Sequence, residues 1–528
     1  MHHSPATSAR SLILSVEHHV PSALSKTIFV IAVSLLGAAL RAHMLGSQSL
    51  WVDEVVTFLS SNGSFGWVIS QSEVNSNIPP LYYLIVHFFL KFGQDEALLR
   101  LPSLIFGVLT IPALYAVADE WLGARLAAIA ALLMAASPFH IWYSQEARPY
   151  ALLLLLALVS IWFAQRLAKH PGSPALTMGF IVSTAATFYC HTVAIPFIAF
   201  LGAHIGWTAP RGARRFWVLV FSAILVAVLP AAFRLIALPP DASADPNRGL
   251  NPIFLAYTVW TFATGYSLGP TLTELHQADR LAFVRHDLPL IAPVALLLGL
   301  VLAAGGLALR RYDASIQRAL VMWLGFPIAF ALAGAMLTPH PFNVRYVILA
   351  YPAFILVLAA GIRQLPNIPA RAAVLAGLGL VSVISLGNYF FDPRYAREDN
   401  RAAGEFLMNR AAPGDLVIAS AAYTVRGFEY YARGTDLCFV GYPAGAIEGT
   451  CPDDLQPGNA GLLESGKPDT DLARIVGSRH RFWVFLSRTY DNTSEAEVLD
   501  FAGRNFRPTS ELTTANDIRL VLYEQTNA

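Results

Sequence analysis

The sequence predicts a mainly α-helical, polytopic membrane protein that ends in a small α/β domain. Of 528 residues, 55% are hydrophobic and 13% are charged, about half the ~25% charged residues of soluble domains. Apolar segments recur from about residue 27 to residue 391 and then stop. A net charge of +1 argues against a nucleic-acid binder, and three cysteines are too few for a disulfide-dense scaffold.

Eleven apolar segments come close to the ~20 residues that a helix needs to cross a bilayer. No small-residue cleavage site follows the first segment, so we expect an anchoring helix there rather than a cleaved signal peptide. The eleven predicted spans are 27–45, 100–118, 125–142, 149–167, 174–190, 193–209, 216–236, 287–309, 319–338, 346–363 and 372–391.

Residues 79–92 form an apolar segment that is too short to be a twelfth span. Its apolar run of about 12 residues is typical of a re-entrant or interfacial helix. Leaving it out collects most loop cations on one side of the membrane, as the positive-inside rule requires. These cations are Arg125, Arg166, Lys169, Arg211, Arg214, Arg215, Arg310, Arg311, Arg318, Arg363 and Arg371. We therefore expect the N-terminus inside and the C-terminal region outside.

This topology predicts two domains. Residues 1–391 form the membrane module, with long external loops at about 46–99 and 237–286, and residues 392–528 form an extracytoplasmic α/β domain. Within the latter, the residue pattern predicts strands at 415–420, 436–441, 481–487 and 518–524, and helices at 399–411, 469–478 and 494–504. Cys438 and Cys451 either pair outside the membrane or remain two buried thiols.

Asp53 and Glu54 follow the first span directly, in the string SLWVDEVVTF. Burial and a like-charged neighbour both raise the pKa of a carboxyl group, so such a pair can provide a general base. The alternative is that the two acids only favour the first turn of a juxtamembrane helix. In the next segment, Tyr82 belongs to a short aromatic helix that lines a groove for a lipid tail or forms an aromatic belt.

Two further polar clusters lie at predicted outer span ends. His140, Gln145, Glu146 and Arg148 occur within nine positions, and His340 and Arg345 lie in the string TPHPFNVRY. Ionisable groups at that depth usually face the bundle interior or an aqueous cavity, and a guanidinium suits phosphate recognition. The alternatives are a helix-end salt bridge for Glu146 and Arg148, and a snorkelling side chain for Arg345 and for Arg100.

The sequence contains no phosphate-binding GxxxxGK[ST] loop, no HExxH motif and no CxxC pair. ATP-driven transport is therefore not indicated. These motifs predict no cofactor. Asp53, Glu73 and Glu274 have carboxylates of the kind that ligate a divalent metal, but the spacing of these residues does not support such a site.

The chain resembles the membrane-embedded glycosyltransferases of the protein O-mannosyltransferase and aminoarabinose-transferase type, which have the GT-C fold and belong to a glycosyltransferase family 39-like group. The strings that carry the resemblance are SLWVDE (49–54), NIPPLYYL (77–84), LLRLPS (98–103), SQEARPY (144–150), HPFNVRY (340–346) and EDNRAAGEFL (398–407).

The resemblance implies a hexosyl- or pentosyltransferase that uses a polyprenyl-phosphate sugar donor on the outer face of a bacterial inner membrane. Asp53 would deprotonate the acceptor hydroxyl, Glu146 would be a second acid, and Arg100, Arg148 and Arg345 would contact the lipid phosphate. The acceptor would be a lipid, a glycan such as lipopolysaccharide, or a protein, and no nucleic acid is involved. Direct displacement would invert the anomeric centre.

Two other functions compete with glycosyl transfer. A transporter or flippase of lipid-linked sugars would use the same groove, but it predicts midplane charges and repeated halves, which the sequence lacks. A glycan-binding receptor would leave the acidic pair and the arginines unexplained.

Overall fold

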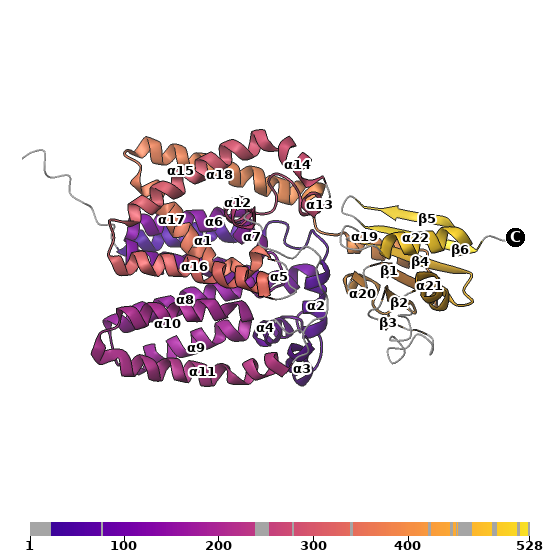
Figure 1. The fold of residues 1–528 in the computed structure, drawn as a ribbon, viewed down its shortest axis with the longest axis horizontal. Helices are drawn as coiled ribbons and strands as arrows, with labels where there is room; N and C mark the ends of the chain where they lie inside the picture. The colour runs from indigo at the N-terminus through magenta and orange to yellow at the C-terminus, as the bar shows by residue number, and fades with distance from the viewer. Residues whose placement is uncertain are drawn as a thin grey trace, which may run out of the picture.

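The computed structural model describes residues 23–74, 78–237, 253–276, 279–337, 342–420, 424–443, 447–449, 451, 467–487, 494–514 and 518–525. A bundle of long helices carries a separate sheet-containing domain at one end (Figure 1). This architecture confirms the predicted fold class, a mainly α-helical membrane protein with a small C-terminal α/β domain.

Eight helical stretches in the described residues are long and apolar enough to span a membrane. They are formed by α1 (Ala23–Ala42), α5 (Glu96–Leu122), α8 (Tyr150–Lys169), η2 with α11 (Arg211–Ala213, Arg214–Ala237), α15 (Leu288–Leu309), α16 (Ala314–Leu337), η3 with α17 (Val344–Ala350, Tyr351–Gln364) and α18 (Ile368–Phe391). The chain is therefore a multi-pass membrane protein.

The predicted count of eleven spans is not confirmed. The expected span 125–142 is broken into α6 (Ala124–Ala136) and α7 (Pro138–Ser144), which are bent by 58° and make a ninth span if counted together. The bend falls where Ser137 caps α7 and Pro138 occupies its first turn, which favours a new helix start. The expected spans 174–190 and 193–209 are the shorter α9 (Pro174–Cys190) and α10 (Ile195–Thr208), the latter preceded by η1 (Thr192–Ala194).

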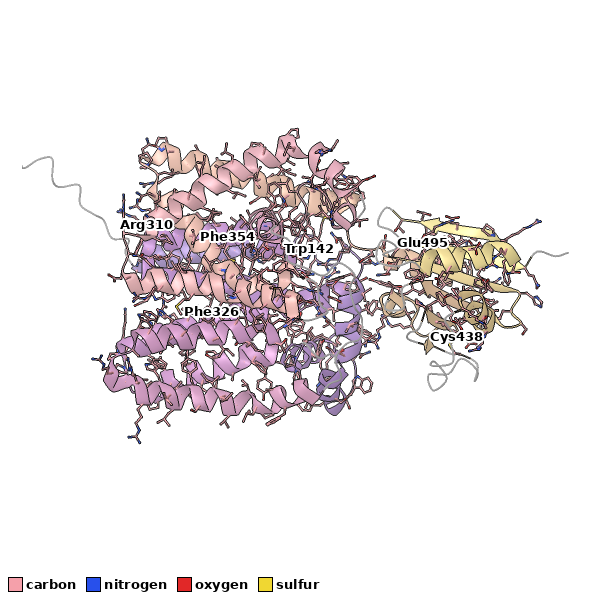
Figure 2. The ribbon with its side chains drawn as sticks, in the orientation of Figure 1. Trp142, Arg310, Phe326, Phe354, Cys438 and Glu495 are labelled. Carbon is pink, nitrogen blue, oxygen red and sulfur yellow. A yellow bond between two sulfur atoms is a disulfide. The ribbon has the colours of Figure 1, made fainter. Side chains whose placement is uncertain are left out.

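Contacts between helix ends agree with alternating helix directions. Lys26 at the start of α1 pairs with Asp119 at the end of α5 at 3.0 Å, and Lys169 at the end of α8 pairs with the neighbouring Glu120. Figure 2 shows Arg310 at this end of the bundle, away from the α/β domain. The helix ends that carry these cations, which we expect on the inner face, therefore lie at the end of the bundle remote from the α/β domain. The orientation of the bundle in a membrane stays a prediction.

The first of the two loops predicted to be external contains α2 (Val52–Ser61), α3 (Phe65–Val74) and α4 (Leu81–Phe89). Helix α4 has nine residues, which is too short to cross a bilayer and agrees with the interfacial segment expected at 79–92. The second long loop contains α12 (Ile253–Thr264), α13 (Leu272–His276) and α14 (Arg280–His286), which sequence reasoning did not predict.

The C-terminal domain is a six-stranded sheet with the order β3-β2-β1-β4-β6-β5. Strand β1 (Leu416–Ser420) runs parallel to β2 (Cys438–Tyr442) and β4 (Arg481–Leu486), whereas β3 (Ile447–Gly449), β5 (Phe506–Thr513) and β6 (Arg519–Gln525) join antiparallel. Its helices are α19 (Asn400–Met408), α20 (Val425–Ala432), α21 (Pro468–Val476) and α22 (Ser494–Asn505), and the short η4 (Pro393–Tyr395) leads into the domain. All four predicted strands and three predicted helices are present. Cys438 and Cys451 form a disulfide.

Candidate functional site

Asp53 lies in the first turn of α2, at the end of the bundle that faces the C-terminal domain. Its Oδ2 accepts a hydrogen bond from Arg345 Nη1 at 2.8 Å and lies 3.7 Å from Arg148 Nη2. Arg148 Nη1 also donates to the Asp53 carbonyl oxygen at 3.2 Å. About a quarter of each of the Asp53 and Arg345 side chains remains exposed. A carboxylate between two guanidinium groups therefore lies within reach of solvent.

A 3-10 helix and a tight turn position these two arginines. Arg345 belongs to the 3-10 helix η3, where the Asn343 side chain accepts a hydrogen bond from the Arg345 backbone N–H at 3.0 Å. Arg148 lies in the tight turn between α7 and α8, where its N–H donates to the Glu146 carbonyl at 2.7 Å. Among the described residues, the Nε atoms of Arg148 and Arg345 have no hydrogen-bond partner. Both guanidinium groups thus retain donor capacity beyond Asp53.

Glu54 points the opposite way from Asp53, into the protein, and is fully buried. Its carboxylate accepts two hydrogen bonds from Arg100, both at 2.8 Å, one from Arg397 at 2.6 Å and one from the Ala147 backbone N–H at 2.8 Å. Burial alone would raise its pKa, but the charges of Arg100 and Arg397 and these hydrogen bonds outweigh burial and lower the pKa to about 2. Glu54 is therefore a permanently ionised anchor.

The Arg100 guanidinium donates all its hydrogen bonds to Glu54 and to the backbone that precedes it. Besides the two bonds to Glu54, its guanidinium donates to the carbonyl oxygens of Leu45, Gln48 and Ser49 at 2.9, 2.9 and 3.0 Å. All five N–H groups are then engaged. This geometry favours a supporting role for Arg100 over the phosphate contact that the resemblance implies.

Arg397, just before α19, is a site residue that sequence reasoning missed. It is 7% exposed, and its guanidinium lies 5.2 Å from the ring centroid of Trp142 as well as against Glu54. Figure 2 shows Trp142 at the end of the bundle nearest the C-terminal domain. The available signal was an arginine directly before the string EDNRAAGEFL that carries part of the resemblance.

Glu146 is a third carboxylate, buried behind Asp53 and Glu54. Its Oε2 has no hydrogen-bond partner among the described residues. Burial raises its pKa to about 7, against the opposing effect of Arg397 and with the support of the Glu54 charge. The four arginines around the three carboxylates leave one positive charge in excess, or two when Glu146 is protonated. The cluster is thus suited to an anionic ligand.

Because its pKa is raised, Glu146 should lower the free energy of unfolding of the parent protein as the pH rises, and Glu146→Gln should remove this effect. Between its usual value of 4.5 and about 7, the unfolded chain loses this proton while the folded protein keeps it, so stability falls as pH rises. We expect the melting temperature of Glu146→Gln, relative to the parent protein, to increase from pH 5 to pH 7.5 and then level off. Thermal unfolding in detergent measures this difference in melting temperature. Glu405→Gln is the control, because Glu405 is exposed. A difference that does not change with pH would contradict this assignment.

The remaining predicted site residues are placed as follows. The Gln145 amide donates to the carbonyl oxygens of Arg41 and His43 at 2.8 and 2.7 Å, so it caps the end of α1. The buried Tyr82 hydroxyl lies 2.6 Å from Ser103 Oγ and joins α4 to α5. Both side chains are engaged in helix packing. His340 lies outside the described residues.

A wall of aromatic residues borders the cluster. The Tyr143 hydroxyl lies 2.8 Å from that of Tyr266, and the rings of Tyr143 and Tyr150 are 4.9 Å apart. The Tyr150 ring is in turn 5.6 Å from that of His191. The rings of Tyr143, Tyr150 and His191 are buried, so they pack beside the cluster and do not form an open surface.

No group of three His, Cys, Asp or Glu side chains that could hold a metal ion occurs within the described ranges. The carboxylates of Asp53 and Glu54 face guanidinium groups, which repel a cation. The described residues therefore do not fit a metal site at this position.

Comparisons with known proteins identify the fold. Residues 77–233 match the dolichyl-phosphate-mannose-protein mannosyltransferase family. The structure of ArnT from Cupriavidus metallidurans bound to undecaprenyl phosphate superposes with a TM-score of 0.56 at 14% identity, covering 96% of this chain and 99% of that chain. Its apo form gives a TM-score of 0.59 at 13% identity, covering 95% and 98%.

The Archaeoglobus fulgidus oligosaccharyltransferase in complex with zinc and sulfate gives a TM-score of 0.54 at 11% identity, covering 94% of this chain and 73% of that chain. No curated protein matches the chain by sequence. The chain therefore has the GT-C fold of membrane glycosyltransferases of the protein O-mannosyltransferase and ArnT type, as its sequence motifs suggest.

Proposed function

We propose that this membrane protein transfers a sugar from a polyprenyl-phosphate donor to an acceptor hydroxyl. The observation that carries the proposal is the partly exposed Asp53 carboxylate between Arg345 and Arg148, at one end of a GT-C bundle. The family match and the undecaprenyl phosphate bound by the similar ArnT structure support a lipid-phosphate donor. We further propose a bacterial inner membrane with this end on its outer face, and a lipid, glycan or protein as acceptor.

In this mechanism Arg345 and Arg148 bind the donor phosphate. Charge-assisted hydrogen bonds from guanidinium groups stabilise the negative charge that develops as the bond between C1 and the phosphate oxygen breaks. The unused donor capacity of both side chains suits this role. The phosphate departs still attached to its lipid, so the reaction needs no nucleotide.

Asp53 acts as the general base. The donor phosphate binds the same two guanidinium groups that pair with the Asp53 carboxylate, so donor binding offsets part of their positive charge, weakens the ion pair at 2.8 Å and makes the carboxylate more basic. The freed Asp53 oxygen then accepts the proton of the acceptor hydroxyl, whose oxygen bonds to C1 as the phosphate leaves. Attack from the side opposite the phosphate inverts the anomeric centre.

In this proposal Glu54, Arg100 and Glu146 support Asp53 without contacting the substrate. Glu54 is held by two arginines and has no oxygen left for a substrate, so Asp53 is the base of the acidic pair. Arg100 keeps Glu54 and the chain leading into α2 in position. Glu146 tunes the charge of the cluster.

Arg345→Ala is expected to weaken donor binding. Losing hydrogen bonds to a charged group costs about 1.5–3 kcal/mol, so the KM for the donor should rise about 10- to 100-fold, with a smaller change in kcat. Arg345→Lys should recover part of this loss because the charge remains without the planar fork. The matched control is Arg394→Ala, because Arg394 pairs with Asp392 on an exposed surface. An unchanged donor KM in Arg345→Ala would exclude a phosphate contact.

Vesicles of known orientation test the reaction and its proposed face together. Radiolabelled undecaprenyl-phosphate hexoses and pentoses are supplied with membranes that lack this protein as the source of acceptor. We expect label to enter acceptor only when the C-terminal domain faces the acceptor. Movement of intact donor across the bilayer without any transfer would instead indicate a flippase.

A further inference from the structure

We propose that the C-terminal domain is a clamp that sets the position of helix α2, and that Arg397 is the positioning residue through which it orients Asp53. The inference rests on the proposed function because it treats Asp53 as the base. The clamp consists of the linker residues 397–400 and helix α20, and each part contacts the chain between Ser49 and Phe58.

The first contact is the buried ion pair between Arg397 and Glu54. Arg397 Nη1 donates to Glu54 Oε2 at 2.6 Å, and both side chains are at most 4% exposed. Arg397 is contributed by the segment that follows the last span, whereas Arg100, the other partner of Glu54, belongs to the bundle. Glu54 therefore links the domain to the bundle one residue away from Asp53.

The second contact holds the backbone that enters α2. The Leu50 N–H donates to the Tyr431 hydroxyl at 2.7 Å, and the Leu50 carbonyl accepts from Asn400 Nδ2 at 3.0 Å. The Ser49 hydroxyl donates to the Glu398 carbonyl at 2.6 Å. Both backbone polar groups of a buried residue are thus satisfied by side chains of the C-terminal domain and its linker.

The third contact is the close packing of α20 on α2, which Figure 1 shows facing each other across the junction. A Cβ atom at Gly427 would lie 3.0 Å from Val52 Cγ2 and 3.3 Å from Asn400 Nδ2. Further along, the rings of Phe58 and Tyr430 meet edge to face at 4.8 Å. The glycine allows α20 to approach the turn of α2 that carries Asp53.

A pocket of about 430 Å³ lies beside this linker and is lined by residues that include Gln48, Arg397, Asp399 and Arg401. The junction is therefore not a solid packed interface, and its geometry depends on the specific contacts above. Because Asp53 and Glu54 share one helical turn, a shift of Glu54 also moves Asp53. A displacement of ~1 Å in a reacting group costs about 100-fold in rate.

Arg397→Met tests the clamp in the full-length protein, with Arg397→Lys as the conservative variant. The matched control is Arg401→Met, since Arg401, in the first turn of α19, also joins the C-terminal domain to the membrane module but pairs with Glu96 at 2.7 Å instead of Glu54. Two quantities are measured for each variant. They are kcat and donor KM for sugar transfer, and hydrogen exchange of the backbone amides of residues 52–61.

For Arg397→Met we expect a loss of kcat of about 100-fold with little change in donor KM, and exchange in α2 faster by about tenfold or more. Arg397→Lys should restore part of both quantities. Arg401→Met should stay within about fivefold in rate and leave exchange in α2 unchanged. Equal effects of Arg397→Met and Arg401→Met on both quantities, or no effect of Arg397→Met on exchange, would overturn the clamp.

Hydrogen exchange separates this proposal from the proposed function. If the parent protein transfers no sugar from any donor but Arg397→Met still loosens α2 and Arg401→Met does not, the enzymatic proposal fails and the mechanical link stands. If transfer is observed and Arg397→Met alters neither rate nor exchange, the clamp fails and the enzymatic proposal stands.

Discussion

Asp53→Asn should abolish sugar transfer, with kcat lower by about 10²- to 10⁴-fold, the usual contribution of a general base. Asparagine has nearly the shape of aspartate and can still accept a hydrogen bond from Arg345, but it cannot take up the proton of the acceptor hydroxyl. Donor KM should stay equal or fall, because the carboxylate no longer competes with the phosphate for Arg345 and Arg148.

This kinetic pattern is the reverse of that expected for Arg345→Ala, which raises donor KM. Initial rates over a range of donor concentrations, measured in both variants, separate a base from a phosphate ligand. Asp392→Asn is the control, because Asp392 is about as exposed as Asp53 and also pairs with an arginine, but its partner Arg394 is not part of the cluster. Unimpaired turnover in Asp53→Asn would remove Asp53 from the mechanism.

Glu54→Ala should destabilise the whole protein rather than inactivate a folded one. The variant leaves Arg100 and Arg397 buried without their carboxylate, and removal of one partner from a buried ion pair typically costs about 3–5 kcal/mol. We expect a lower yield of folded protein and a clearly lower melting temperature in detergent. Glu54→Gln should show a smaller loss because it keeps the volume and part of the hydrogen bonding.

The matched control for Glu54→Ala is Glu96→Ala. Glu96 also pairs with an arginine of the C-terminal domain, Arg401, but both side chains are partly exposed, and such pairs contribute about 0–1 kcal/mol. A Glu54→Gln variant with the parent melting temperature and no activity would instead make Glu54 a catalytic group.

Because the pKa of Glu54 is lowered to about 2, the stability that its charge contributes is present above pH 4.5 and is lost as the pH falls toward 2.

Segment hydropathy predicted most of the fold because the length and apolar pattern of a segment are local properties of the sequence. The four buried strands β1, β2, β4 and β6 were predicted for the same reason. Strand β5 was missed because it is an edge strand with mostly exposed polar residues, so it lacks an apolar signature. Helix α12 was missed because it is a short apolar helix within a loop rich in proline and polar residues.

The site was only partly predictable. Charge asymmetry and the sequence resemblance placed Asp53, Arg148 and Arg345 on one side, and the structure brings these three together. The pairing of Glu54 with Arg397 joins residues 343 positions apart, which no local pattern indicates. Which of two adjacent carboxylates faces solvent also depends on the rotation of α2, and that rotation follows from tertiary contacts.

In the proposed reaction, this site breaks the bond between a sugar and a polyprenyl phosphate. The most direct measurement uses purified protein in detergent, where no membrane separates two compartments, with a panel of radiolabelled polyprenyl-phosphate sugars and membranes lacking the protein as acceptor. We expect one donor of the panel to be consumed with release of polyprenyl phosphate, and Asp53→Asn to consume it about 10²- to 10⁴-fold more slowly. Binding of a lipid-linked sugar without any release of polyprenyl phosphate, or equal release by the parent protein and Asp53→Asn, would contradict it.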